Sequence, residues 1–449
     1  MMLSRSTFGR NAPRALQTVA SRRAMASAAS GFQYDISESA GVKVANRQGA
    51  GPTSTLAVVA KAGTRFQPLP GFSDALAQFA FKSTLKRSAL RITREVELLG
   101  GELSSKNSRE NIVLKAKFLS NDLPYFAELL AEVASQTKFP AHELKEHVAA
   151  LLHFKQKSIA AHPEVLAVEA AHGVAFHRGL GENITEVPFE KYVNVEALAE
   201  FAKEAYSKPN VAVVSSGADS AELSKWVGEF FKELPSGSTI QSEASKYYGG
   251  ETRISSKTGN AVVVGFPGSS TFGTPGYKPE VAVLASLLGG ESTIKWTPGF
   301  SLLAKATEGF SGVHASTKNN AYSDAGLLTI TVSGATSQIG EVSKSVVEAI
   351  KKVAAGEVPS EEVKKALALA KFRALESVEN IETGLEATGS ALLTGGKPYH
   401  VGEIAQAIDS VTAEKVQETA KSLLSGKASV ASVGDLHSLP FAEELGLTV

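Results

Sequence analysis

Two long stretches of this sequence resemble each other at a separation of more than 200 residues. The segment "SSKNSRENIVLKAKFLS" starts at Ser104, and "STKNNAYSDAGLLTITVSG" starts at Ser316, an offset of 212 (316 − 104). Similarly, "EALAEFAKEAYS" ends at Ser207 and "EKVQETAKSLLS" ends at Ser425, an offset of 218 (425 − 207). A repeat of this length predicts two similar domains, whereas solenoids repeat every 20–50 residues or so. The length of 449 residues agrees, because single cores stop growing at about 250–300 residues.

Within each half, strand-like and helical patterns follow one another without strict βαβ alternation, which favours an α+β fold. Residues 235–245, "PSGSTIQSEAS", are polar and contain Gly, Ser and Pro, as linkers do. We therefore expect domains at 32–234 and 246–449. In the first of these, the patterns predict strands at 42–48, 54–63 and 210–217, a hairpin at 101–120, and helices at 71–84, at 88–99 and from Asp122, Ala141, Pro163, Val195 and Asp219 onward.

The first 31 residues differ in composition from the rest of the chain. They contain five serines and no acidic residue before Asp35, and their arginines are Arg5, Arg10, Arg14, Arg22 and Arg23. An Arg- and Ser-rich, acid-free leader is typical of mitochondrial transit peptides, with a disordered basic tail as the alternative. We expect cleavage between Arg23 and Phe32. Removing the five arginines would leave 41 basic and 46 acidic residues, so the mature protein would be mildly acidic.

Composition excludes several classes of function. The chain has no cysteine, which rules out disulfides, thiol catalysis and thiolate metal sites. No run approaches the roughly 20 apolar residues of a membrane-spanning helix. The formal net charge is zero, and the sequence has neither Lys/Arg runs nor basic–aromatic stripes, so nucleic acid is not an expected partner.

A resemblance to a known family is carried by "GFSDALAQFAFKSTLKRSALRITREVELLGGEL" and the hairpin that follows it. The frame consists of a glycine, a short motif, F-K-x-T, a helix and then "ELLGGEL". It resembles the N-terminal domain of the pitrilysin-type zinc peptidases, a family that includes the mitochondrial processing peptidase and the core subunits of the respiratory cytochrome bc complex (complex III). The resemblance runs from about residue 35 to the C-terminus. It implies two homologous domains, each a mainly antiparallel sheet with packed helices.

Active members of that family carry H-x-x-E-H on the helix that corresponds to residues 71–84. Residues four apart on a helix lie about 40° apart around its axis, so both histidines can bind one Zn²⁺. The intervening glutamate is the general base, and a third ligand follows roughly 75 residues later. By this correspondence, the two histidine positions hold Asp74 and Gln78, the base position holds Ala77, and the third ligand position holds Lys155. These four residues are the degenerate positions of a site that we expect to hold no metal and to be inactive.

We expect no catalytic, metal or cofactor site elsewhere in the chain. Asp74 is interpreted as an ordinary surface or polar-core residue, and the glycine-rich stretch 265–276 as a loop at the end of a strand. The closest histidine pairs are five residues apart, or about 140° around a helix, so neither pair faces one point. The nine histidines are therefore expected to be surface or helix-capping residues: His142, His147, His153, His162, His172, His177, His314, His400 and His437.

Three interpretations of the resemblance compete. An active zinc peptidase does not fit the four substituted positions. The α subunit of the mitochondrial processing peptidase should have a long glycine-rich loop after "VAVLASLLGG" (281–290), but here the chain continues with Glu291, Ile294, Lys295 and Trp296. That stiffer segment favours a core subunit of complex III.

As a core subunit of complex III, the chain would bind no haem, quinone or iron–sulfur cluster. The resemblance implies a peripheral protein on the matrix side of the mitochondrial inner membrane, paired with a paralogous core protein 1 in a dimeric complex. The other partners would be cytochrome b, the c-type cytochrome subunit and the Rieske protein, and the role would be to support assembly and stability of the complex.

Overall fold

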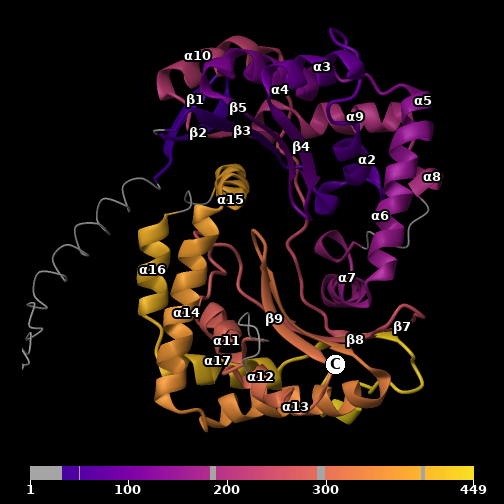
Figure 1. The fold of residues 1–449 in the computed structure, drawn as a ribbon, viewed down its shortest axis with the longest axis vertical. Helices are drawn as coiled ribbons and strands as arrows, with labels where there is room; N and C mark the ends of the chain where they lie inside the picture. The colour runs from indigo at the N-terminus through magenta and orange to yellow at the C-terminus, as the bar shows by residue number, and fades with distance from the viewer. Residues whose placement is uncertain (1–32, 50, 183–188, 291–298, 396–399) are drawn as a thin grey trace, which may run out of the picture.

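Two sheets, one above the other in Figure 1, form the centres of two halves of the molecule. The structure, a computed structural model, describes residues 33–49, 51–182, 189–290, 299–395 and 400–449. The predictions about the leader (1–31) and about the segment 291–296 lie outside the described residues. So do the last two residues of the "GLGENI" stretch (179–184), which also resembles the family.

Both sheets are mixed, with one parallel pair each and otherwise antiparallel pairing. The first has the order β1-β2-β6-β3-β5-β4 and is made of β1 (Asp35–Ser39), β2 (Val42–Arg47), β3 (Thr53–Ala60), β4 (Glu102–Asn107), β5 (Ile112–Leu119) and β6 (Val211–Ser216). The second has the order β7-β11-β8-β10-β9 and is made of β7 (Gly250–Ser255), β8 (Asn260–Pro267), β9 (His314–Ala321), β10 (Gly326–Gly334) and β11 (Ser429–Gly434).

Helices cover both faces of each sheet. In the first half of the chain they are α2 (Phe72–Phe79), α3 (Ala89–Leu99), α4 (Leu123–Gln136), α5 (Ala141–Glu143), α6 (Ala149–Ala161), α7 (Pro163–Phe176), α8 (Phe189–Tyr192), α9 (Val195–Ala205) and α10 (Ser220–Phe230). In the second half they are α11 (Pro279–Leu288), α12 (Leu302–Ala306), α13 (Thr336–Ala355), α14 (Ser360–Glu379), α15 (Ile381–Thr394), α16 (Val401–Asp409) and α17 (Ala413–Ser425).

The internal duplication is visible strand by strand. Strand β6 runs parallel to β2, and β11 runs parallel to β7. Ser429, the first residue of β11, stands 218 positions after Val211, the first residue of β6 (429 − 211), which matches one of the offsets found in the sequence. The first sheet has one extra strand, because β1 pairs with the outer edge of β2, whereas no strand of the described residues pairs with the outer edge of β7.

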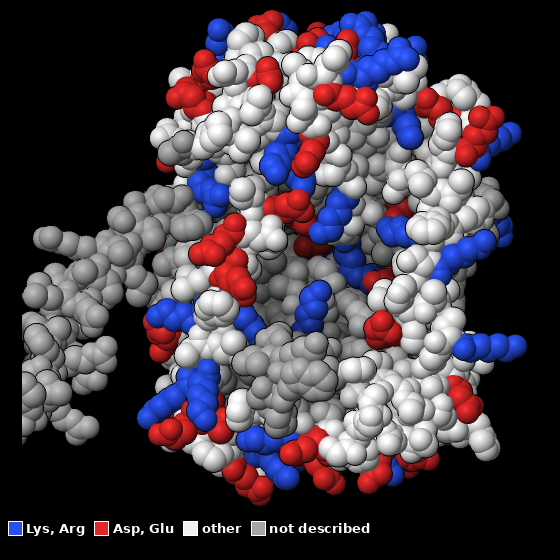
Figure 2. Space-filling model, in the orientation of Figure 1, with Lys and Arg blue, Asp and Glu red and all other residues white. Residues whose placement is uncertain are grey.

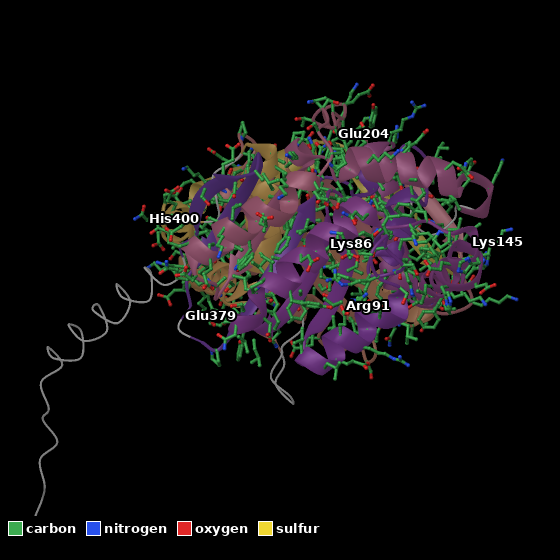
Figure 3. All side chains as sticks on the ribbon, turned by 90° about the horizontal axis from the view of Figure 1, so that it is seen from above. Lys86, Arg91, Lys145, Glu204, Glu379 and His400 are labelled. Atoms are coloured by element: carbon green, nitrogen blue, oxygen red, sulfur yellow. The ribbon has the colours of Figure 1, made fainter. Side chains whose placement is uncertain are left out.

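Each half contributes one helix to the sheet of the other half. Helix α7 packs on β8 and β11 of the second sheet, and α15 packs on β3 and β6 of the first. The chain passes from one half to the other through α6, which precedes α7, and through α14, which precedes α15. These two helices lie on opposite sides of the molecule (Figure 1). In the view from above, Lys145, which lies shortly before α6, and Glu379, the last residue of α14, are on opposite sides of the molecule (Figure 3). The molecule is hollowed between the halves, and side chains of both charges line the hollow (Figure 2).

The main core of the first half is apolar in the places that helical periodicity predicts. Phe126, Leu129, Leu130 and Val133 of α4 are buried against the sheet, as expected. Each such side chain contributes about 1.5–3 kcal/mol relative to exposure, so the fold is maintained by residues that do no chemistry. Among the described residues, no helix is long and apolar enough to cross a lipid bilayer.

Most elements predicted for the first half are confirmed, with three corrections. The helix predicted over 71–84 covers only 72–79, because the chain turns at Phe81, which has a left-handed backbone (φ 63°) and is only half-buried. Strand β1 was not predicted at all. It is joined to β2 by a two-residue turn in which Ala40 and Gly41 both have positive φ, the geometry of a tight hairpin. The third correction concerns His172, which lies in the region of the candidate site.

Candidate functional site

Helix α2 is positioned by its apolar face. Phe72 packs edge-on against Phe201 of α9 with 6.2 Å between the ring centres, and Phe79 packs similarly against Phe139 at 5.2 Å. Gly71, which precedes the helix, has φ 92°, a conformation that favours glycine and turns the chain into α2. The helix therefore has a fixed orientation, with Asp74 and Gln78 one turn apart, as the zinc motif would require.

Asp74 is joined to two side chains from other elements. Lys155 of α6 forms an ion pair with it, and Asn107 at the end of β4 donates a hydrogen bond to Asp74 Oδ1 (2.9 Å). Lys155 Nζ also donates to Asn107 Oδ1 (3.1 Å), so the three side chains form a closed triangle. Asp74 is only 6% exposed. It is thus a polar-core residue, one of the two options expected from the sequence.

The structure brings together residues that the resemblance singles out. Asp74 and Ala77 lie buried on α2, half-buried Gln78 lies on the same helix, and Lys155 reaches Asp74 from α6. Ala77 has no group that can accept a proton, and the Gln78 amide is neutral. The Lys155 ammonium already neutralises the one carboxylate in the group.

This donor set does not fit a zinc ion. Zinc sites use thiolate, imidazole and carboxylate ligands, which must be deprotonated to bind. Here a single carboxylate is available, and it is engaged by an ammonium group that would repel a dication. Within the described part of the chain, no group of three or more His, Cys, Asp or Glu side chains could hold a metal ion. The triangle of Asp74, Lys155 and Asn107 is suited to holding α2, α6 and β4 together.

A second polar cluster, which sequence analysis missed, joins the two halves. The turn of hairpin β4–β5 (108–111) meets the turn of hairpin β9–β10 (322–325), and Arg65 from a 3₁₀ turn (Thr64–Phe66) lies between them. Arg65 donates to Glu110 Oε1 (2.9 Å) and binds Asp324 through two hydrogen bonds (2.7 and 2.6 Å). Burial alone would raise the pKa of Asp324, but hydrogen bonds from Arg65 and from the Ser245 backbone outweigh it and lower that pKa. The two hairpin turns are equivalents in the duplication, so this ion cluster lies where the halves meet.

His172 of α7 is buried at the same junction, so the expectation that every histidine is a surface or capping residue is wrong for this one. It is 2% exposed, its Nδ1 lies 2.7 Å from the Val168 carbonyl, and its Nε2 lies 2.8 Å from the hydroxyl of Tyr322. Burial, with the nearby charge of Arg109, lowers the pKa of His172 to about 3, so the ring is neutral. In that state Nδ1–H donates to the carbonyl and Nε2 accepts from Tyr322.

These contacts have no signature in the sequence of one half. His172 is buried because α7 crosses to the other sheet, and Arg65 finds its partner 259 positions away. The one available signal was the repeat itself, since "KNSREN" and "KNNAYSDAG" occupy equivalent hairpins.

Comparison with known proteins identifies the family of the chain. Residues 43–186 match the family Insulinase (Peptidase family M16), and residues 192–369 match the Peptidase M16 inactive domain. The chain belongs to the peptidase M16 family. The α+β prediction with two domains of this type is confirmed.

Several M16 relatives cover nearly the whole chain. Cytochrome b-c1 complex subunit 2 of Neurospora crassa is 50% identical over 100% of both chains. Subunit 2 of the same complex from Yarrowia lipolytica is 40% identical over 92% of this chain and 96% of its own. The mitochondrial-processing peptidase subunit alpha of Solanum tuberosum is 28% identical over 89% of this chain and 81% of its own.

From the sequence, two segments, residues 93–101 and 115–133, are interpreted as resembling core protein 2 of the cytochrome bc complex more than the peptidase subunits. Over whole chains, the subunit 2 relatives of Neurospora crassa and Yarrowia lipolytica are more similar than the processing-peptidase subunit, which confirms the likeness of the chain as a whole to subunit 2.

Proposed function

We propose that this M16 protein is a non-catalytic core subunit of the cytochrome b-c1 complex, respiratory complex III, and supports its assembly and stability. The observation that carries the proposal is the 50% identity to a subunit 2 along the full length of both chains. The same complex appears in the names of relatives from distant organisms, including the 28% identical human subunit 2.

The proposal that the chain is not itself an enzyme rests on the chemistry of the α2 site. Hydrolysis by an M16 peptidase needs a zinc-bound water and a carboxylate that takes its proton. At the corresponding positions this chain has a methyl group on Ala77, a neutral amide on Gln78 and an ammonium group on Lys155. The ion pair of Lys155 with Asp74 gives these residues a structural task.

The finer parts of the proposal concern placement and partners. We place the chain at the matrix side of the mitochondrial inner membrane as a peripheral subunit, with residues 1–31 as a transit peptide. Its partner would be the core protein 1 paralogue, and the assembly would be dimeric and would include cytochrome b, the c-type cytochrome subunit and the Rieske protein. Domains at 32–234 and 246–449, joined by a linker at 235–245, remain part of the same proposal.

The test is gentle detergent extraction of mitochondria followed by affinity purification of the tagged full chain. We expect b- and c-type haem absorbance to co-elute with it at near-stoichiometric levels. Co-elution of a zinc-bearing partner with presequence-cleaving activity and no haem would instead identify a processing-peptidase α subunit. Deletion of the gene should abolish assembled complex III, and a fully assembled, active complex in the deletion strain would contradict the assembly role.

A further inference from the structure

The two duplicated sheets differ at one edge. On the first sheet, the outer edge of β2 is covered by β1, whose residues pair in antiparallel register from Asp35↔Asn46 to Ser39↔Val42. On the second sheet, β7 takes the place of β2, and no described strand pairs with its outer edge. The opposite edges, β4 and β9, are equivalent in the two halves and give no such contrast.

The chain enters the two strands differently although their first turns are alike. Gly41 before β2 and Gly249 before β7 both have φ 77°. Before Gly41 the chain turns back as a hairpin and supplies β1. Before Gly249 comes the segment 235–249, which forms no helix or strand. The segment 235–249 thus precedes β7 as β1 precedes β2, but it supplies no strand that covers the edge of β7.

The free edge of β7 has backbone groups with no internal partner. Gly250 N–H donates to Ala428 O (3.0 Å) and Ser256 N–H to Gly434 O (3.1 Å), so the even-numbered residues of β7 point their backbone groups toward β11. The odd-numbered ones therefore point outward, because successive residues of a strand alternate. Among the described residues, no hydrogen-bond partner is present for the backbone N–H groups of Glu251, Arg253 and Ser255.

A groove runs along this edge. It has a volume of about 780 Å³ and is lined by residues 249–255, by the small α7 residues Ala170, Gly173 and Val174, and by His177, which follows α7. A floor of small residues leaves room for the side chains of an added strand. On the other face of β7, Glu251 and Arg253 are ion-paired with each other (3.3 Å), and Arg253 is held by carbonyls of residues 436–440. These contacts hold Glu251 and Arg253 on the face of β7 away from α7, while the groove lies on the α7 side.

The side of the second sheet next to β7 is also covered by fewer elements than the corresponding side of the first sheet. In the first half, α10 lies beside β1, and Ser39 Oγ donates to Ser224 O of that helix (2.9 Å). In the second half, the chain after β11 forms only a short 3₁₀ turn, Glu443–Leu445. In the described part of the second half, both elements that close this side of the first half are therefore absent.

We propose that the free edge of β7 binds an extended segment of another subunit, which adds to the second sheet as an antiparallel strand in the place that β1 takes on the first. This mode of recognition uses main-chain hydrogen bonds for affinity and alternate side chains for specificity. The segment has small apolar side chains at alternate positions, which face Gly173 and Val174, and polar side chains between them. The inference rests on the proposed function, because the segment comes from a subunit of the same complex.

The test is amide hydrogen exchange of the isolated full chain and of the same chain in the purified, haem-bearing complex. We expect exchange at Glu251, Arg253 and Ser255 to slow about tenfold or more in the complex. Thr252 and Ile254, which bond to β11, are the internal control and should be protected in both states. Equal rates at the outward-facing amides in both states would overturn the inference. Protection of these amides already in the isolated chain would also overturn the inference. An exchange rate independent of protein concentration would then indicate a covering segment of this chain, and an exchange rate that depends on concentration would indicate a second copy.

A matched pair of variants sharpens the test. Ser255 is exposed, so Ser255→Pro removes one outward N–H, whereas Ser255→Ala retains it. Both isolated variants should have the melting temperature of the unmodified chain. In the complex, Ser255→Pro should lower the protection of the Glu251 and Arg253 amides from hydrogen exchange, and Ser255→Ala should not. Full protection in the Ser255→Pro complex would contradict the proposal. A haem-bearing complex with an unprotected β7 overturns this inference alone, whereas a chain that never co-purifies with haem overturns the proposed function as well.

Discussion

Lys155 of α6 is ion-paired with Asp74 of α2, and the proposed correspondence places both residues at zinc-ligand positions of active M16 peptidases. The ammonium group of Lys155 therefore lies against the Asp74 carboxylate. Asn107 forms a hydrogen bond with each of the two side chains. The ion pair links α2 to α6. In the proposed account, the fold is retained while the groups needed for hydrolysis are replaced by groups that stabilise it.

Replacing Lys155 by Met should destabilise the chain by about 1–3 kcal/mol, because Asp74 would stay buried with only Asn107 as a partner. The measurement is the free energy of unfolding of the isolated chain in urea. Lys155→Arg is the control, since it keeps the charge. The double variant Asp74→Asn with Lys155→Met should recover part of the loss, and a double variant as unstable as the sum of the single ones would show that the two residues are not coupled.

Replacing Arg65 by Met should cost about 3–5 kcal/mol, because Glu110 and Asp324 would lose their shared cation at the junction of the halves. Lys115→Met is the matched control, because Lys115 also pairs across the halves, with Glu382, but that carboxylate is exposed. The control should cost less than about 1 kcal/mol. Similar losses in the two variants would argue against a special role for the Arg65 cluster.

Stability should fall with acidity between about pH 6.5 and pH 3 in part because of His172. Its pKa is about 3 in the folded chain and about 6.5 when unfolded, so the unfolded state binds the extra proton in this window. The contribution is complete above pH 6.5 and is lost as the pH falls toward 3. The measurement is the unfolding free energy against pH for the unmodified chain and for His172→Gln. The variant should be less stable at pH 7 and show a smaller slope; parallel curves would contradict the assignment.

The contact of α15 with the first sheet should be sensitive to a single methyl group. A Cβ at Gly389 would lie 2.4 Å from a methyl carbon of Val59 on β3, so Gly389→Ala should cost about 1–3 kcal/mol. The control is Gly340→Ala in α13, where the nearest atom is 3.9 Å away and alanine should stabilise the helix by up to about 1 kcal/mol. Melting temperatures should shift in opposite directions, and equal shifts would indicate that α15 does not depend on this close contact.

What the sequence could predict was set by local periodicity and by the repeat. Helix α3, the β4–β5 hairpin and the apolar face of α4 follow from patterns within a few turns of chain. The positions of Asp74 and Lys155 followed from the family resemblance. Strand β1, "DISES", is polar and mostly exposed, so its pairing depends on the turn at Gly41 and on β2. The exchange of α7 and α15, and with it the burial of His172, depends on the sheet of the other half, which local patterns cannot report.

The central claim is tested most directly by calorimetric titration of the full chain with Zn²⁺, alongside the variant Asp74→His, Ala77→Glu, Gln78→His, Lys155→Glu. For the unmodified chain we expect no saturable one-to-one site that depends on Asp74, and no cleavage of presequence peptides. The fourfold variant, if it folds, should gain a zinc site, because it restores three protein ligands on the same helices. Stoichiometric zinc bound by the unmodified chain and lost in Asp74→Ala, together with peptide cleavage, would contradict the account.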